Sequence, residues 1–112
     1  PLSGGMLSGK YVDGARPKGS RWTLVQRNGL FRDNPRSQDA TRAYCDIAAK
    51  YNITPSQLAL AWVDQVDGVC STIIGATTMV QLRENIEAFN ISLSHECLVD
   101  IEKVLMQYST PF

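Results

Sequence analysis

The chain has 112 residues, enough for one domain by length alone. Hydrophobic residues make up 44% and charged residues 20%, and equal numbers of basic and acidic residues leave a formal net charge of zero. This neutrality argues against nucleic-acid binding and against electrostatic attachment to a membrane. The apolar runs are also far shorter than the roughly 20 residues that span a bilayer.

The first 36 residues are rich in glycine, proline and basic side chains. Met6 to Tyr11 predict a short helical turn, and the remainder reads as a long loop, which in a compact domain is usually functional or disordered. Pro1 is not a translation start, and residues 2–5 resemble the middle of a strand-to-loop passage. The start therefore suggests a proteolytic cut, an engineered start or a chain whose earlier part is missing.

Two helices are predicted next. Apolar residues at helical spacing from Ala40 to Tyr51 predict the first, with Ser37 or Asp39 as its cap and Asn52 as its stop. The second helix has a capping box formed by Thr54 at the N-cap and Gln57 at N3, with Pro55 at N1. It is apolar nearly all round, which predicts burial, and Asp67-Gly68 is expected to end it.

Residues 69–75 predict one short parallel strand, because β-forming residues make a continuous apolar run that Gly75 closes. This strand has no partner in the sequence. Each unpaired buried backbone group costs about 1–3 kcal/mol. The rest of the sheet must therefore come from another chain, a symmetry mate or a missing N-terminal region.

Two more helices are expected after this strand. Thr78 and Gln81 form a capping box for the first, whose inner stripe is Leu82, Ile86 and Phe89. The last helix begins at Ser94. Its hydrophobic staple and inner stripe are formed by Leu93, Leu98, Ile101, Leu105 and Tyr108.

Two segments could bind an anion. After the predicted strand, a tight turn opens a helix whose N–H groups, with Thr77, Thr78 and Gln81, would face the ligand. Glu84 and Asn85, one turn later, could bind an adenine. The alternative is a well-capped helix with polar residues on its solvent face.

The second candidate is Gly4-Gly5, where small residues allow close backbone approach to a phosphate, followed by Lys10 and Arg21. Here the alternative is an ordinary glycine-rich loop with solvated basic residues.

Other reactive residue types lack the arrangement that catalysis or metal binding requires. His95 stands at a helix start and is expected to be exposed, and no nucleophile and base are paired in the sequence. Cys45, Cys70 and Cys97 lack zinc or redox spacing, and we expect three reduced, buried thiols in a cytoplasmic protein. Trp22 is expected to pack, although its place on the loop could bring it to a substrate.

At this point two motifs show a resemblance. Residues 1–11, PLSGGMLSGKY, resemble the segment after strand seven of the aldo-keto reductases, and residues 75–86, GATTMVQLRENI, resemble their strand-eight cofactor motif. The sequence is most similar to the branch that includes bacterial Tas-like reductases and β-subunits of voltage-gated potassium channels. The resemblance covers essentially the whole chain in the right order.

The resemblance implies an α/β fold, the (β/α)8 TIM barrel, of which residues 1–112 would be a single partial domain. Residues 1–36 would be the cofactor loop, and residues 37–112 the helices and last barrel strand. The implied cofactor is NADPH, with NADH less favoured. The implied contacts are Leu2, Ser3, Gly4 and Lys10 for the pyrophosphate, Arg21 for the phosphates, Gly75, Thr77 and Gln81 for the 2′-phosphate, and Glu84 with Asn85 for the adenine.

This sequence departs from the family in two respects. Many members have Lys-Ser at Gly75-Ala76 and Arg at Gln81, so two cations are lost from the 2′-phosphate site, a neutral pattern that the channel-subunit branch shares. The family's catalytic tyrosine, lysine, aspartate and histidine lie in the first half of the barrel, so no catalytic residue is assigned here.

Three functional hypotheses follow. The first is the cofactor-binding part of an oxidoreductase that reduces a small carbonyl substrate, an aldehyde or ketone, by hydride transfer from NADPH; the fragment alone is expected to be inactive. The second is a redox-sensing regulatory subunit similar to the channel β-subunits. The third is a non-catalytic fragment that assembles with its own copies through residues 69–75.

Overall fold

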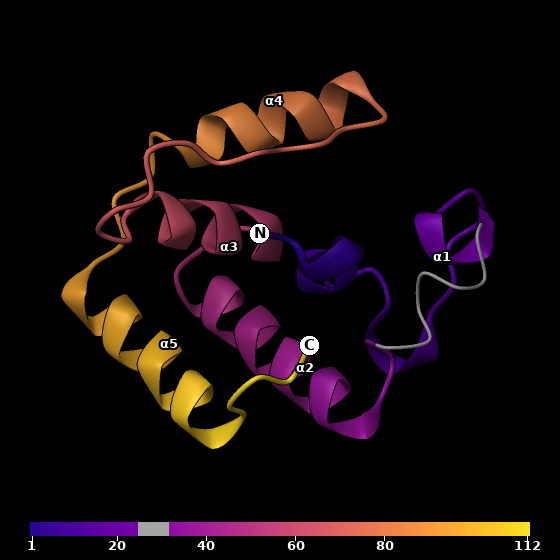
Figure 1. Ribbon diagram of the computed structural model, residues 1–112, viewed down its shortest axis with the longest axis horizontal. Helices are drawn as coiled ribbons and strands as arrows, with labels where there is room; N and C mark the ends of the chain where they lie inside the picture. Colours follow the sequence, from indigo (N-terminus) through magenta and orange to yellow (C-terminus); the bar gives the residue numbers. More distant parts are fainter. Residues whose placement is uncertain (25–31) are drawn as a thin grey trace.

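A computed structural model describes residues 1–24 and 32–112, and all of its regular secondary structure is helical (Figure 1). The predicted loop residues 25–31 lie outside this described part. The elements in chain order are the 3-10 helices η1 (Ser3–Ser8) and η2 (Val12–Gly14) and the α-helices α1 (Arg21–Leu24), α2 (Pro35–Lys50), α3 (Pro55–Asp64), α4 (Met79–Ala88) and α5 (His95–Gln107). The first 24 residues are thus more helical than the sequence predicted.

The predicted helix over residues 40–51 exists as α2, but its start was wrongly placed. Asn34 is the N-cap, because its side chain accepts from the N–H of Ser37 at 3.0 Å, and the Ser37 hydroxyl accepts from the N–H of Asn34 at 3.1 Å. This reciprocal pair satisfies two donors at the helix end, so neither Ser37 nor Asp39 caps it. Asn52 follows the helix with φ 56°, the left-handed conformation expected of its stop.

The start of α3 confirms the predicted capping box. The Thr54 hydroxyl accepts from the N–H of Gln57 at 3.1 Å, and the Gln57 side chain accepts from the N–H of Thr54 at 3.0 Å. The helix ends at Asp64, earlier than the predicted Asp67-Gly68, and Gly68 adopts φ 88° in the turn that follows. For α5, Ser94 caps the helix as predicted.

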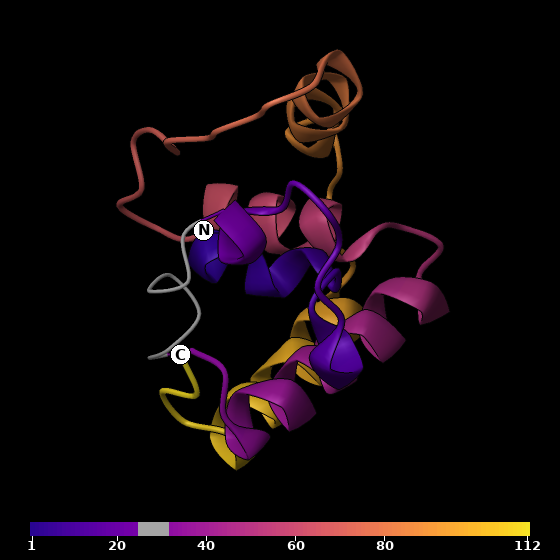
Figure 2. The same cartoon turned by 90° about the vertical axis from the view of Figure 1, so that its right-hand side faces the viewer.

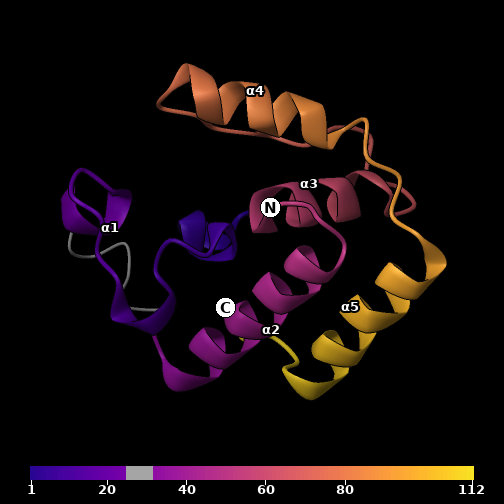
Figure 3. The same cartoon turned by 180° about the vertical axis from the view of Figure 1, so that it is seen from behind.

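The main core lies between α2, α3 and α5, which form one side of the molecule (Figures 1 and 3). Its buried members are Ile47 and Ala48 from α2, Leu58 and Ala61 from α3, Leu93, and Cys97, Ile101 and Val104 from α5. On the other side of this core, α4 and η1 both pack against α3. Figure 2 shows α3 between α4 and η1, whereas Figures 1 and 3 show η1 beside one end of α3.

The predicted strand at residues 69–75 was wrong for this structure. These residues have neither helical nor strand structure, and the described part of the chain contains no strand at all. Ile73, expected in a buried sheet, is 87% exposed. The physical reason is that a strand needs neighbouring strands to pair its backbone groups, and the described residues supply none.

The predicted inner stripe of α4 was also partly wrong. The side turned toward the protein carries the buried Asn85 and Ala88, with Leu82 and Phe89 half-buried. Ile86 is 54% exposed, and Met79 and Val80 are exposed as well. Among the described helices, α4 makes extensive contacts only with α3, so much of its apolar surface stays exposed to solvent.

The cysteines are free, and only Cys97 is buried, whereas Cys45 is half-buried and Cys70 is exposed. The expectation of three buried thiols was therefore correct for Cys97, correct only in part for Cys45, and wrong for Cys70, which belongs to the uncovered segment 69–75. Within the described residues, every helix is too short or too polar to cross a membrane.

Candidate functional site

The glycine turn at the N-terminus has a backbone conformation that matches its sequence. Ser3, Gly4 and Gly5 adopt φ values of 48°, 66° and 96° in succession. Such a run of left-handed residues is strained for side chains with a Cβ but not for glycine. As the first residues of a 3-10 helix, Ser3 and Gly4 have no preceding helical carbonyl for their N–H groups, which leaves donors for an anion.

Two cationic side chains flank this turn. The Lys10 Nζ lies 3.4 Å from the position that a Cβ of Gly5 would occupy, and the Arg32 Cδ lies 3.6 Å from the corresponding position at Gly4. Lys10 was predicted from the sequence, whereas Arg32 was missed. Its signal is tertiary, because Arg32 is far from Gly4 along the chain and only folding brings the two together.

A stacked aromatic pair lies next to the glycine turn. Tyr11 and Trp22 stack with ring centroids 4.1 Å apart and planes 6° from parallel, and together with Met6 they form a small buried cluster. The Lys10 Nζ lies 5.2 Å from the centre of the Tyr11 ring, and the Arg16 guanidinium lies 5.1 Å from the centre of the Trp22 ring. The stack thus holds the Lys10 ammonium beside the glycine turn, and the burial of Trp22 confirms that it is a packing residue.

Of the other residues predicted at this end, Leu2 is half-buried directly before η1, and its carbonyl accepts from the N–H groups of Gly5 and Leu7. Arg21 opens α1 and is exposed. The structure therefore brings Leu2, Ser3, Gly4 and Lys10 together. Arg21 is connected to these residues only indirectly: it precedes Trp22, whose ring stacks on Tyr11, the residue after Lys10.

The second predicted segment surrounds the start of α4. Thr78 caps this helix, and its hydroxyl accepts from the N–H of Gln81 at 3.2 Å. The Gln81 side chain does not complete the predicted capping box with Thr78. It accepts instead from the N–H and the hydroxyl of Thr77, at 2.9 and 3.0 Å. Gly75 is exposed, and a Cβ there would meet nothing within 4 Å.

Glu84 and Asn85, the predicted adenine ligands, are engaged within the protein. Glu84 accepts a hydrogen bond from the hydroxyl of Thr54, which links α4 to the start of α3. Asn85 is 3% exposed and donates to the carbonyl of Gly75 at 3.4 Å. Both side chains would have to exchange these partners in order to bind an adenine.

The two predicted segments are not brought together. The glycine turn belongs to η1 and the second segment leads into α4, and these two elements share few or no contacts among the described residues. A ligand that touches both segments would require a different relative placement or additional protein.

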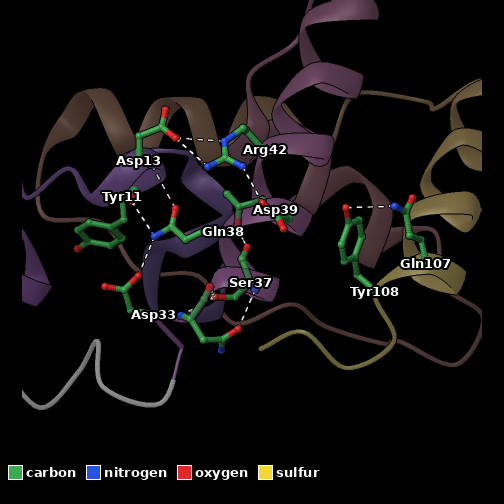
Figure 4. A network of polar contacts seen from close by, with 11 residues as sticks. Tyr11, Asp13, Asp33, Ser37, Gln38, Asp39, Arg42, Gln107 and Tyr108 are labelled. Carbon is green, nitrogen blue, oxygen red and sulfur yellow. Dashed lines mark hydrogen bonds and ion pairs between the residues drawn. The ribbon is translucent and has the colours of Figure 1, made fainter.

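A polar network ties the N-terminal segment to α2 (Figure 4). Gln38 bonds to Tyr11, Asp13 and Asp33, and the Arg42 guanidinium bonds to Asp13 and Asp39. These bonds hold the residues that follow Lys10 against the first turns of the helix.

Two side chains of α2 have pKa values that burial shifts. Burial raises the pKa of the Tyr44 phenol and, in Cys45, that of the thiol, so both favour their neutral forms. His95 is exposed, as predicted. Within the described part of the chain, no cluster of three or more histidine, cysteine, aspartate or glutamate residues could hold a metal ion.

The chemistry of the glycine turn fits a bound phosphate group. A left-handed run with open N–H donors and two adjacent cations is suited to a pyrophosphate. At α4, the capped helix start offers N–H groups and hydroxyls but no cation among the predicted residues. That second fit is therefore one of hydrogen bonding only.

Comparison with known proteins identifies relatives along nearly the whole chain. The sequence model of the Aldo/keto reductase family matches residues 1–106. Protein tas of Escherichia coli is 44% identical over 110 residues, which are 98% of this chain and 32% of that protein. A putative voltage-gated potassium channel subunit beta of Schizosaccharomyces pombe is 39% identical over 111 residues, 94% of this chain and 32% of that protein.

A protein named aldo-keto reductase from Babesia bovis is 39% identical over 106 residues, covering 91% of this chain and 36% of its own length. The chain thus spans about a third of the length of the curated relatives that it matches.

Proposed function

Because the chain belongs to the Aldo/keto reductase family, we propose that it forms the C-terminal, cofactor-binding part of an NADP(H)-dependent reductase of aldehydes or ketones. The observation that carries this proposal is the glycine turn of Ser3, Gly4 and Gly5, flanked by Lys10 and Arg32. When bound, the cofactor would supply a hydride to the substrate carbonyl. The catalytic groups would come from outside these 112 residues, and the chain alone would be inactive.

In this proposal the chain completes a (β/α)8 barrel. Residues 69–75 would become a barrel strand once neighbouring strands pair with it, since its exposed apolar side chains, such as Ile73, then become buried. A second surface in need of cover is an apolar hollow of about 270 Å³ between the helices. Among its lining residues are Leu58, Trp62, Ile101, Leu105 and Phe112.

We assign the cofactor contacts as follows. The turn at Leu2, Ser3 and Gly4 would donate N–H groups to the pyrophosphate, and Lys10, Arg21 and Arg32 would neutralise its charge. In the barrel, Gly75, Thr77 and Gln81 would hold the 2′-phosphate end, while Glu84 and Asn85 would exchange their present partners for the adenine. Because none of Gly75, Thr77 and Gln81 carries a positive charge, the preference for NADPH over NADH would be smaller than in family members with Lys and Arg at these positions.

A regulatory role is the second candidate, because relatives named as potassium channel β-subunits match most of the chain. Both roles require the same cofactor site, so turnover distinguishes them: a reductase oxidises NADPH in the presence of a carbonyl substrate through many cycles, whereas a sensor binds it with little turnover. A third role, self-assembly through residues 69–75, predicts concentration-dependent association without NADPH binding.

The test is titration of the full-length parent protein with NADPH, comparing the wild type with Arg32→Gln. Loss of a charge-assisted contact to phosphate should weaken binding by about tenfold or more. Arg36→Gln is the matched control, because Arg36 carries the same charge and is exposed at the start of α2, where it bonds to the carbonyl of Ser109. Absence of NADPH binding by the wild type would refute the proposed function.

A further inference from the structure

Gln38, on the first turns of α2, makes three hydrogen bonds to residues outside its own helix (Figure 4). Its Oε1 accepts from the N–H of Asp13 at 3.2 Å, and its Nε2 donates to the carbonyl of Tyr11 at 3.2 Å. The Nε2 also donates to Oδ1 of Asp33 at 2.7 Å. One carboxamide thus pairs both backbone groups of the Tyr11–Asp13 segment and binds a side chain twenty residues farther along the chain.

The carboxamide pairs two backbone groups at the start of η2. One donor and one acceptor on the same group meet the C=O of Tyr11 and the N–H of Asp13, two residues apart. Only glutamine and asparagine carry both functions in one amide, and asparagine is one methylene shorter. Residue 38 therefore has to be glutamine for both bonds to form from this position.

The segment held by Gln38 connects directly to the proposed phosphate site. Tyr11 follows Lys10, and its ring lies under the Lys10 ammonium and stacks on Trp22. Asp33 follows Arg32, the cation beside Gly4, and forms an ion pair with Arg16. Gln38 thus links Tyr11, which follows Lys10, to Asp33, which follows Arg32.

We propose that Gln38 is a positioning residue that fixes Lys10 and Arg32 on either side of the glycine turn for a cofactor pyrophosphate. This inference relies on the proposed function for the identity of the ligand. Gln38 itself touches no ligand; it acts by holding the backbone next to both cations. Arg42 helps to hold only the segment after Lys10, because it bonds to the Asp13 carboxylate and not to Asp33.

Two substitutions separate the bonds of Gln38. Gln38→Met keeps the length of the side chain but removes every hydrogen bond. Gln38→Glu keeps the acceptor for the N–H of Asp13 but loses both donors, and it places a carboxylate beside the carboxylates of Asp33 and Asp39. The matched control is Gln107→Glu, which makes the same change at an exposed glutamine that bonds only to Tyr108 among the described residues.

The experiment has two arms. In the 112-residue chain, amide hydrogen exchange of Asp13 is followed by NMR, which reports the bond to Gln38 without any cofactor. In the full-length parent protein, the Kd for NADPH is measured by fluorescence titration. We expect Gln38→Met to accelerate Asp13 exchange by about fivefold or more, Gln38→Glu to leave it within about threefold, and both to weaken NADPH binding by about fivefold or more. Gln107→Glu should change neither quantity.

Unchanged Asp13 exchange in Gln38→Met would overturn the inference, since the bond would then not hold the segment. Unchanged NADPH affinity in both Gln38 variants, with a wild type that binds, would also overturn it while leaving the proposed function intact. A wild type that does not bind NADPH would refute the proposed function and with it the cofactor role of Gln38. The exchange arm would still show whether Gln38 holds the segment.

Discussion

Tyr11 and Trp22 stack almost in parallel, with ring centroids 4.1 Å apart, although ten residues separate them in the sequence. Both rings are nearly inaccessible to solvent. Among the described residues, this pair and Met6 form a buried cluster separate from the main core, and this cluster lies beside the proposed phosphate site.

We therefore predict that Trp22→Ala destabilises the N-terminal segment. Truncation of a buried tryptophan costs about 3–5 kcal/mol in a packed core. The effect should be confined mainly to residues 1–24, because the cluster is separate from the core of α2, α3 and α5. Hydrogen exchange followed by mass spectrometry would check this: Met6 to Trp22 should lose protection while α5 keeps it. Trp22→Phe, which preserves a stacked ring, should have a much smaller effect, and equal protection in all three proteins would contradict the prediction.

Thr54 has two tasks at the start of α3, and its loss should affect both. Its hydroxyl accepts from the N–H of Gln57 and donates to Glu84 of α4. Thr54→Val keeps the shape but removes these bonds, and we expect a loss of about 1–2 kcal/mol in the free energy of unfolding. Urea unfolding monitored by circular dichroism measures it. Thr54→Ser restores the hydroxyl and should recover most of the loss; a valine variant as stable as the wild type would show that the cap is not needed.

Asp100 links α2 to α5, and its contribution should depend on pH. Its carboxylate bonds to Lys50 at 2.6 Å, to Lys103 at 2.9 Å and to the Tyr51 hydroxyl at 3.0 Å, and the bond to Lys50 is the main cause of a pKa far below the ordinary range. A carboxyl whose pKa is lowered by folding stabilises the protein above its unfolded pKa, about 3.9, and this stabilisation is lost as the pH falls further.

Asp100→Asn should thus be less stable than the wild type at pH 6, and the difference should shrink as the pH is lowered from about 5 toward 2. Thermal unfolding of both proteins across this range tests the sign. Glu102→Gln is the control, since Glu102 is an exposed acid on the same helix. A difference between wild type and Asp100→Asn that stays constant down to pH 2 would show that the carboxylate does not gain from its partners.

The isolated 112-residue chain should not reduce carbonyl compounds. The two proposed halves of the cofactor site lie at η1 and at the start of α4, which share few or no contacts among the described residues, and no catalytic residue is assigned in this chain. A half-formed site must also order its partners on binding, so we expect weak NADPH affinity or none. Absorbance at the NADPH band with an aldehyde substrate measures turnover. Sustained oxidation by the purified chain, absent from a denatured control, would contradict this prediction.

The sequence by itself determined the features that depend on a few neighbouring residues. The box of Thr54 and Gln57, the cap at Ser94 and the left-handed Asn52 were all predicted correctly. Each of them involves atoms within one helical turn, so local stereochemistry is sufficient. The family could also be recognised from two motifs, because the residues of each motif are contiguous in the chain.

Tertiary structure decided what depends on distant partners. Residues 69–75 have strand-forming side chains, yet no strand forms, because backbone pairing has to come from a neighbour that the described residues lack. Arg32 beside Gly4 and Gln38 between Tyr11 and Asp33 are contacts across the fold. A linear pattern fixes the conformation of a turn or a cap, whereas burial, stacking and pairing depend on which surfaces folding brings together.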